Sequence, residues 1–74
     1  MLIYQRIKEL RTERKLTQVQ LAEGMGCSQA SVANWENGQI RPTWESVVAL
    51  ARFFDVSSDY LLGLEDEFGE KIKF

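Results

Sequence analysis

The sequence predicts an all-α fold, a compact five-helix bundle. Apolar residues recur at helical spacing in successive short segments, and nothing within residues 1–63 alternates as a half-buried strand does. A serine or threonine that can act as an N-cap stands before each helix after the first: these residues are Thr17, Ser28, Thr43 and Ser57. The expected helices cover about residues 3–14, 18–24, 29–37, 44–54 and 58–62.

The first two helices follow from an apolar stripe and a capping pattern. Ile3, Ile7 and Leu10 repeat at i, i+4 and i+7, so one face of the first helix is apolar. Thr17, with Gln20 three residues later, forms the capping-box pattern, in which two side chains bond the free amides at the start of a helix. The second helix is therefore expected to begin directly after Thr17.

A tight turn separates the second helix from the third. Gly26 can take the left-handed conformation that ends a helix at low cost. Ser28 then caps the third helix, whose Val32 and Trp35 are expected to point inward. Residues 17–38 are therefore predicted to form a helix-turn-helix.

The fourth helix follows a proline. Arg41 precedes Pro42, a position that is disfavoured in helices, so the loop should extend to Thr43. The fourth helix then has a broad apolar face: Val47, Val48, Leu50, Ala51 and Phe54. Trp44 is expected to lie in the core, as Trp35 is, rather than on a stacking surface for single strands.

A short fifth helix completes the domain, and the chain then changes in character. Residues 1–63 form the predicted domain, and residues 64–74 form an acidic and then basic tail, LEDEFGEKIKF. The tail suggests a partner or dimer contact, a frayed terminus, or the start of a linker to a further domain. Phe53 lies off the inward stripe of the fourth helix. With Tyr60 and Leu64 it suggests a dimer patch, unless the tail covers it.

The composition is that of a soluble globular domain with unevenly distributed charge. The chain has 45% hydrophobic and 27% charged residues, one cysteine and no apolar run near the ~20 residues of a membrane span, so we expect a cytoplasmic protein. The net charge of −2 argues weakly against nucleic-acid binding. It divides into +2 for residues 1–41 and −4 for residues 42–74, so the N-terminal half is the one suited to phosphates.

The residue types that catalysis or metal binding would need are missing from the sequence. The chain has no histidine and one cysteine, and no glycine loop ends in the Lys-Ser/Thr pair that cradles phosphates. We therefore expect no enzyme, no cofactor and no metal site. Cys27, just before the third helix, is interpreted as a small buried hydrophobe. The alternative is a redox-sensitive thiol whose pKa the helix N-terminus lowers.

Four motifs stand in a characteristic order along the chain: LTQVQLAEGMG, SQASVANWENG, Arg41-Pro42-Thr43 and VSSDYLLG. Over about residues 3–63 this set resembles the Cro/repressor-type helix-turn-helix family, also called the XRE family, whose domains are lambda-repressor-like. The resemblance implies that the third helix enters the major groove of DNA. Two positions depart from the pattern. Gly24 lies where a helix former is usual, and Asp55 lies where glycine is common, although aspartate tolerates the left-handed conformation.

The resemblance implies that the first turns of the third helix read bases. Gln29, Ala30 and Ser31 lie at its start, and Asn34 lies one turn further along. Glutamine and asparagine can pair bidentately with adenine, an alanine methyl can contact a thymine methyl, and serine can bond a base or a phosphate. Phosphate contacts, which fix the register on DNA, are expected from Gln18, Arg11, Lys15, Ser28, Asn37 and Arg41.

The expected function is that of a sequence-specific transcriptional regulator, a repressor that binds a pseudo-palindromic operator on double-stranded DNA as a homodimer. The two recognition helices would then lie about 34 Å apart, one turn of DNA. Two alternatives stay open. The chain could be the antitoxin of a toxin–antitoxin pair, with Phe68–Phe74 binding the toxin, or a protein-interaction module with no role on DNA.

Overall fold

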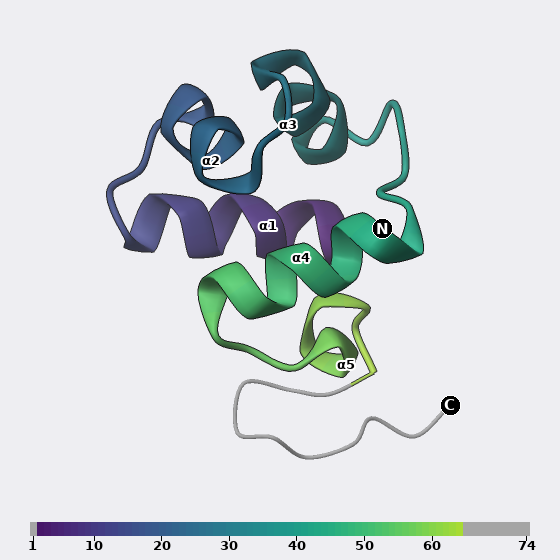
Figure 1. Ribbon diagram of the computed structural model, residues 1–74. Helices are drawn as coiled ribbons and strands as arrows, with labels where there is room; N and C mark the ends of the chain where they lie inside the picture. Colours follow the sequence, from purple (N-terminus) through teal and green to yellow (C-terminus); the bar gives the residue numbers. More distant parts are fainter. Residues whose placement is uncertain (1, 65–74) are drawn as a thin grey trace.

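The computed structural model describes residues 2–64, and every regular element in that range is an α-helix (Figure 1). The helices are α1 (Leu2–Glu13), α2 (Gln18–Met25), α3 (Gln29–Glu36), α4 (Trp44–Phe54) and α5 (Ser58–Leu61). The predicted all-α, five-helix architecture is confirmed, and the expected boundaries are met to within one residue. The tail contacts considered above for residues beyond Leu64 lie outside the described range.

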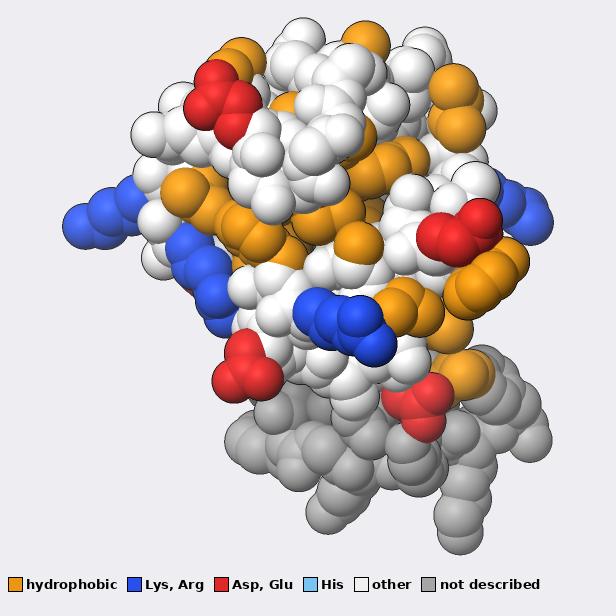
Figure 2. All heavy atoms as spheres, viewed as in Figure 1, with side chains coloured by type: hydrophobic (Ala, Val, Ile, Leu, Met, Phe, Trp, Pro, Cys, Tyr) orange, Lys and Arg blue, Asp and Glu red, His pale blue; other side chains and the backbone are white. Residues whose placement is uncertain are grey.

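The helices are arranged around α1, which lies between two groups of elements. α2 and α3 pack against each other on one side of α1, and α5 lies on the other side, below α4 (Figure 1). α4 contacts both α5 and α2, so it joins the two groups. On the face shown in Figure 2, hydrophobic side chains reach the surface over α4 and beside α5. Within residues 2–64, no helix has the length and hydropathy needed to cross a membrane.

The four predicted N-caps set where the helices begin. The side-chain oxygens of Thr17, Ser28, Thr43 and Ser57 each accept a hydrogen bond from the backbone N–H three residues later. Thr17 and Gln20 complete the capping box, since the Gln20 side chain accepts the Thr17 backbone N–H at 2.8 Å. Each such cap stabilises a helix by about 1 kcal/mol. These short helices therefore begin where the sequence dictates.

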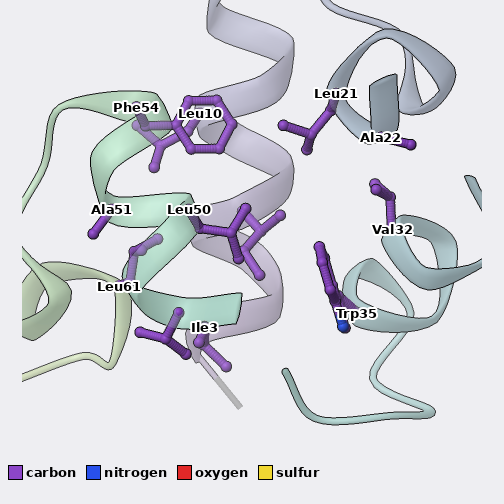
Figure 3. Packing of buried hydrophobic residues seen from close by; sticks show 12 residues of the cluster. Ile3, Leu10, Leu21, Ala22, Val32, Trp35, Leu50, Ala51, Phe54 and Leu61 are labelled. Atoms are coloured by element: carbon purple, nitrogen blue, oxygen red, sulfur yellow. The ribbon is translucent and has the colours of Figure 1, made fainter. Parts of the chain in front are cut away.

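The core is a single apolar cluster to which all five helices contribute (Figure 3). α1 buries Ile3, Ile7 and Leu10, the stripe predicted from the sequence, and α3 buries Val32 and Trp35. The other buried members are Leu21, Ala22, Val47, Leu50, Ala51, Phe54 and Leu61. Because the cluster holds α3 from beneath through Val32 and Trp35, the opposite face of α3 is left for contacts with solvent or a partner.

Trp44 was expected in the core, and that prediction is wrong. Its side chain is 75% exposed, whereas Trp35 is 6% exposed. Trp44 is the first residue of α4, and the inward stripe of that helix passes through Val47 and Leu50. Trp44 stands three residues before Val47, so it lies at the edge of the inward stripe. Its side chain shares the outward side of α4 with Val48, four residues later. Val48 is itself 37% exposed, although it was assigned to the apolar face.

Phe53 is half-buried and packs against the core. Its ring packs edge-on against Phe54, with centroids 5.1 Å apart and an interplanar angle of 89°. The ring also lies against Gly24 of α2, where a Cβ atom would come within 2.5 Å of Cε2 of Phe53. The glycine that departs from the family pattern is therefore the residue that lets the Phe53 ring pack against α2.

Arg6 of α1 and Arg14, in the turn directly after α1, contact the C-terminal half of the domain. Arg6 donates to the backbone carbonyl of Tyr60, and its guanidinium stacks 4.0 Å from the centre of the Tyr60 ring. Arg14 donates to the carbonyl of Phe54, at the C-terminal end of α4 where a cation is favoured. Asp55 follows in the left-handed conformation, φ 54° and ψ 48°, as expected of a residue that replaces glycine there.

Candidate nucleic-acid interface

The turn between α2 and α3 fixes the angle at which α3 is presented. Gly26 is left-handed, φ 73° and ψ 28°, and its N–H donates to the carbonyls of Ala22 and Glu23. The Cys27 N–H donates to the same Ala22 carbonyl at 3.0 Å. Ser28 then caps α3, so the chain reverses within three residues and no flexible linker separates the two helices.

The residues predicted to read bases lie along the outer side of α3. Gln29 and Ala30 are exposed in its first turn, and Ser31 and Asn34 are half-buried. The Ser31 hydroxyl lies 3.0 Å from that of Ser28, so part of its hydrogen-bonding capacity is used within the protein. Gln29 and Ala30 are thus the most accessible of the four, and Asn34 lies deeper on the same helix.

A hydrogen-bond network links Gln29 to α2 and, through Glu36, to α1. The Gln29 amide donates to Oε1 of Gln18 at 2.7 Å, and the Gln18 amide donates to Oε1 of Glu36 at 3.2 Å. Arg11 donates two hydrogen bonds to the same carboxylate, from Nε to Oε2 at 2.6 Å and from Nη2 to Oε1 at 2.9 Å. A third Arg11 nitrogen, Nη1, donates to the carbonyl of Leu16 at 2.7 Å. The chain of contacts therefore runs from α1 through α3 and α2 back to the tip of α3.

The pair of Arg11 and Glu36 is largely removed from solvent. The two side chains are 13% and 5% exposed, and they form a salt bridge with Arg11 Nε 2.6 Å from Glu36 Oε2. The hydrogen bonds to Glu36 raise the pKa of Arg11 above its ordinary value, although partial burial acts in the opposite direction. Bidentate geometry of this kind gives orientation as well as energy. Glu36 therefore keeps α1 and α3 in register while its remaining bond positions Gln18.

Sequence reasoning missed Glu36 as part of the site. One signal in the sequence pointed to Glu36, because the helix dipole disfavours an acidic residue in the last turn of a helix. Such a residue is stabilised by a cationic partner. The identity of that partner, 25 residues earlier in the chain, depends on how α1 crosses α3. Arg11 was expected to contact phosphate. Three of its five N–H donors are used inside the protein, so such a contact would have to use the remaining two.

The other predicted phosphate contacts lie in the loops and caps around α2 and α3. Lys15 is exposed and left-handed, φ 57°, in the connection that leads into α2. Asn37 and Arg41 are exposed in the segment that follows α3, where the Asn37 Oδ1 accepts the Gln39 N–H at 3.0 Å. Ser28 and Gln18 stand at or beside the N-termini of α3 and α2. Free N–H groups at such termini favour anions.

Cys27 lies under this surface and packs against the core. Its surroundings raise the pKa of the thiol through desolvation, and a backbone hydrogen bond offsets this only in part. The direction is opposite to the one that a reactive thiolate requires. The geometry supports the interpretation of Cys27 as a small apolar residue.

The arrangement of α2, the tight turn and α3, with a polar outer face held from below, defines a helix-turn-helix domain. Residues 7–61 match the family model described as Helix-turn-helix. The chain therefore belongs to the helix-turn-helix family, of the Cro/repressor (XRE) type that its motifs resemble.

Relatives and solved structures agree with this assignment. The chain is 42% identical over 69 residues to the uncharacterized HTH-type transcriptional regulator YobD of Bacillus subtilis (strain 168), with 93% of this chain and 62% of that protein covered. It is 39% identical over 62 residues to the HTH-type transcriptional activator BcrR of Enterococcus faecalis, with 84% and 30% covered. The chain thus spans less than two thirds of these relatives.

A crystal structure gives the likeness in three dimensions. The P22 c2 repressor protein, solved in complex with a synthetic operator, superposes on this domain with a TM-score of 0.77 at 31% sequence identity. The match covers 82% of this chain and 92% of that one.

Proposed function

We propose that this domain binds a specific double-stranded DNA sequence as a homodimer in the cytoplasm and regulates transcription, acting as a repressor. The observation that carries the proposal is the network that ends on Gln29. A glutamine whose amide is already oriented by Gln18, on a helix fixed by Glu36, is prepared to pair with an adenine edge. Similarity to a repressor solved on its operator supports the same function.

The mechanism follows from the geometry of α3. Its first turn enters the major groove, where Gln29 and Ala30 meet base edges and Asn34 reaches them from one turn further along. The caps and loops at Gln18, Ser28 and Lys15 lie over the sugar-phosphate backbone and fix the register. Repression is then steric, since a dimer seated on an operator excludes polymerase from the same DNA.

The test begins with selection of bound duplexes from a random library at near-physiological salt. We expect a pseudo-palindrome with half-sites about ten base pairs apart. Gln29→Ala should then weaken binding to the selected site by about 1–3 kcal/mol while leaving non-specific binding unchanged. Gln5→Ala is the matched control, because Gln5 is exposed on α1. Equal losses on specific and random duplexes would refute base reading by Gln29.

The choice between repression and activation needs a separate measurement, because one of the relatives is an activator. A reporter placed downstream of the selected operator should lose expression when the protein is supplied. A rise in expression would show activation and would leave DNA binding in place. The antitoxin alternative rests on Phe68–Phe74, which lie outside the described residues.

A further inference from the structure

The surface of α4 and α5 carries apolar side chains that the fold does not use. Trp44 is 75% exposed, Leu62 is 43% exposed and Val48 is 37% exposed. Figure 2 shows hydrophobic side chains gathered over this part of the molecule. A large exposed aromatic among other apolar residues is typical of an interaction surface. The face lies away from the outer side of α3, so a partner bound there leaves the candidate DNA interface open.

Two hollows flank Val48 on this surface. One, of about 330 Å³, is lined by Trp44, Val47 and Leu62 together with neighbouring atoms. The other, of about 300 Å³, is lined by Ala51, Arg52 and Asp55 among others. Val48 borders both of them. It therefore lies between the Trp44 indole, at the N-terminal end of α4, and the hollow lined by Arg52, at the C-terminal end.

The spacing along α4 makes this face complementary to itself. Trp44, Val48 and Arg52 stand at i, i+4 and i+8, so they share one side of the helix. Trp44 and Arg52 are each about 6 Å from Val48 along the axis, at 1.5 Å per residue. A two-fold axis at Val48 therefore brings Trp44 of one copy over Arg52 of the other. An isologous interface requires this relation, in which i meets j and j meets i.

We propose that α4 packs antiparallel against α4 of a second copy of this chain, with each Trp44 seated in the hollow at Arg52 of the other copy. The proposal deepens the function proposed above, on which it rests, by naming the surface through which the dimer forms. The Arg52 guanidinium stacks on the indole, and the Asp55 carboxylate offers an acceptor for the indole N–H. Val48 meets its counterpart at the axis.

Charge complementarity favours a second copy over an unrelated partner. Glu45, exposed in the first turn of α4, lies beside Trp44, and Arg52 is exposed in the last turn. The antiparallel arrangement brings Glu45 of each copy toward Arg52 of the other, while Asp55 at the same end faces the indole N–H of Trp44. Among residues 2–64, neither side chain takes part in a salt bridge within the chain. An unrelated partner would need neither the equal spacing nor the alternating charge.

Disulfide crosslinking tests the register directly. In the 74-residue chain carrying Cys27→Ala, Val48→Cys should form a covalent dimer under mild oxidation, because a two-fold axis at this residue brings the two Cβ atoms together. Val19→Cys is the control, since Val19 is 51% exposed on α2, outside the proposed face. Crosslinking at 48 and not at 19, with or without the selected duplex, supports the proposal. Absence of crosslinking at position 48, or equal crosslinking at positions 48 and 19, overturns the proposal.

Sedimentation equilibrium supplies an independent measurement. Trp44→Ala and Arg52→Glu should each raise the dimer dissociation constant at least about tenfold, as expected for a central aromatic or arginine in an interface. Circular dichroism reports whether each variant keeps its helices, and Arg52→Glu, at an exposed position, carries the test if Trp44→Ala does not fold. An unchanged dissociation constant in the folded variant contradicts the proposal.

The outcomes separate this surface from the proposed function. A protein that crosslinks at 48 and binds no duplex refutes the DNA function and leaves the dimer face standing. A protein that selects an operator, and whose Val48→Cys variant stays uncrosslinked on it, refutes the face and leaves the function.

Discussion

Glu36 connects three helices through one carboxylate, and the orientation of Gln29 depends on it. The carboxylate accepts from Arg11 and from Gln18, and Gln18 in turn accepts from Gln29. Both members of the ion pair are largely buried. A change at Glu36 therefore acts on stability and on the candidate interface together, although Glu36 itself contacts neither a base nor a phosphate in the proposed mechanism.

Glu36→Gln should lower the free energy of unfolding by about 3 kcal/mol. The reason is that the Arg11 guanidinium would be left largely buried without a counter-charge. Urea unfolding followed by circular dichroism measures the effect. Glu23→Gln, at an exposed position on α2, is the matched control and should change stability by less than about 0.5 kcal/mol. Equal effects of the two substitutions would show that the ion pair contributes little.

Cys27 should react slowly with iodoacetamide in the folded domain. Desolvation raises the pKa of its thiol, so the fraction present as thiolate at pH 8 is smaller in the folded state than in the unfolded state. The buried Cys27 thiol therefore contributes its full stability to the folded domain below the pKa of an unfolded cysteine, about 8.5. That contribution is lost as the pH rises from there through the pKa of Cys27 in the folded domain. Alkylation rates with and without urea measure the difference. Equal rates in the two states would instead indicate a reactive thiol.

At the scale of the elements, the contact of α2 with α4 depends on Gly24. Glycine inside a helix normally costs about 0.5–1 kcal/mol relative to alanine. Here the added Cβ atom would lie 2.5 Å from the ring of Phe53, which is held edge-on against Phe54. The steric cost at this position therefore opposes the gain in helix propensity.

Gly24→Ala should destabilise the domain by about 1 kcal/mol, because the Phe53 ring has to move. In a Phe53→Leu background the same substitution should become stabilising by about 0.5–1 kcal/mol, since the clash is gone and the helix propensity remains. A double-mutant cycle from urea unfolding gives the coupling between the two positions. If the effects of Gly24→Ala and Phe53→Leu on the free energy of unfolding are additive, the Phe53 ring moves away from the added Cβ atom without a loss of stability.

The sequence predicts the elements of this domain better than the contacts between them. The caps at Thr17, Ser28 and Thr43 are local, because side chain and amide lie within three residues of one another. The turn at Gly26 is likewise a property of a few consecutive residues. Positions 29, 30, 31 and 34 all lie on α3 where expected, whereas their contacts with DNA stay predictions.

What the sequence could not predict depends on tertiary geometry. The partner of Glu36 is set by the crossing of α1 and α3, and the role of Gly24 is set by the position of Phe53 on another helix. Trp44 was misplaced because a residue at the first position of a helix can align with either edge of the apolar stripe. Helical periodicity alone does not decide between the two edges.

At the scale of the whole molecule, the charge distribution leaves the proposed DNA binding dependent on a few cations. The chain carries a net charge of −2, and Arg11 is engaged with Glu36. Exposed cations near α2 and α3 include Lys15 and Arg41. Each subunit is therefore expected to neutralise few phosphates, and occupancy of an operator should depend on both subunits binding together.

Lys15→Ala and Arg41→Ala should each weaken binding about equally on specific and random duplexes. Each should also reduce the slope of log affinity against log salt by about 1, because one fewer counterion is released per site. Titrations at several salt concentrations measure the slope. Lys8→Ala is the control, since Lys8 is exposed on α1 and has no predicted phosphate contact. A slope unchanged by the first two substitutions would remove them from the set of phosphate contacts.

The hydrogen bond between Gln18 and Gln29 limits how such a domain can acquire a new operator. Under the proposed function, a substitution at Gln29 alone would change the base that is read and would also remove the side chain that donates to Gln18, so two properties would change at one mutational step. The two positions are therefore epistatic, and a gain at one has a value that depends on the residue at the other. A library that varies both positions together reaches new specificities that single-site libraries miss.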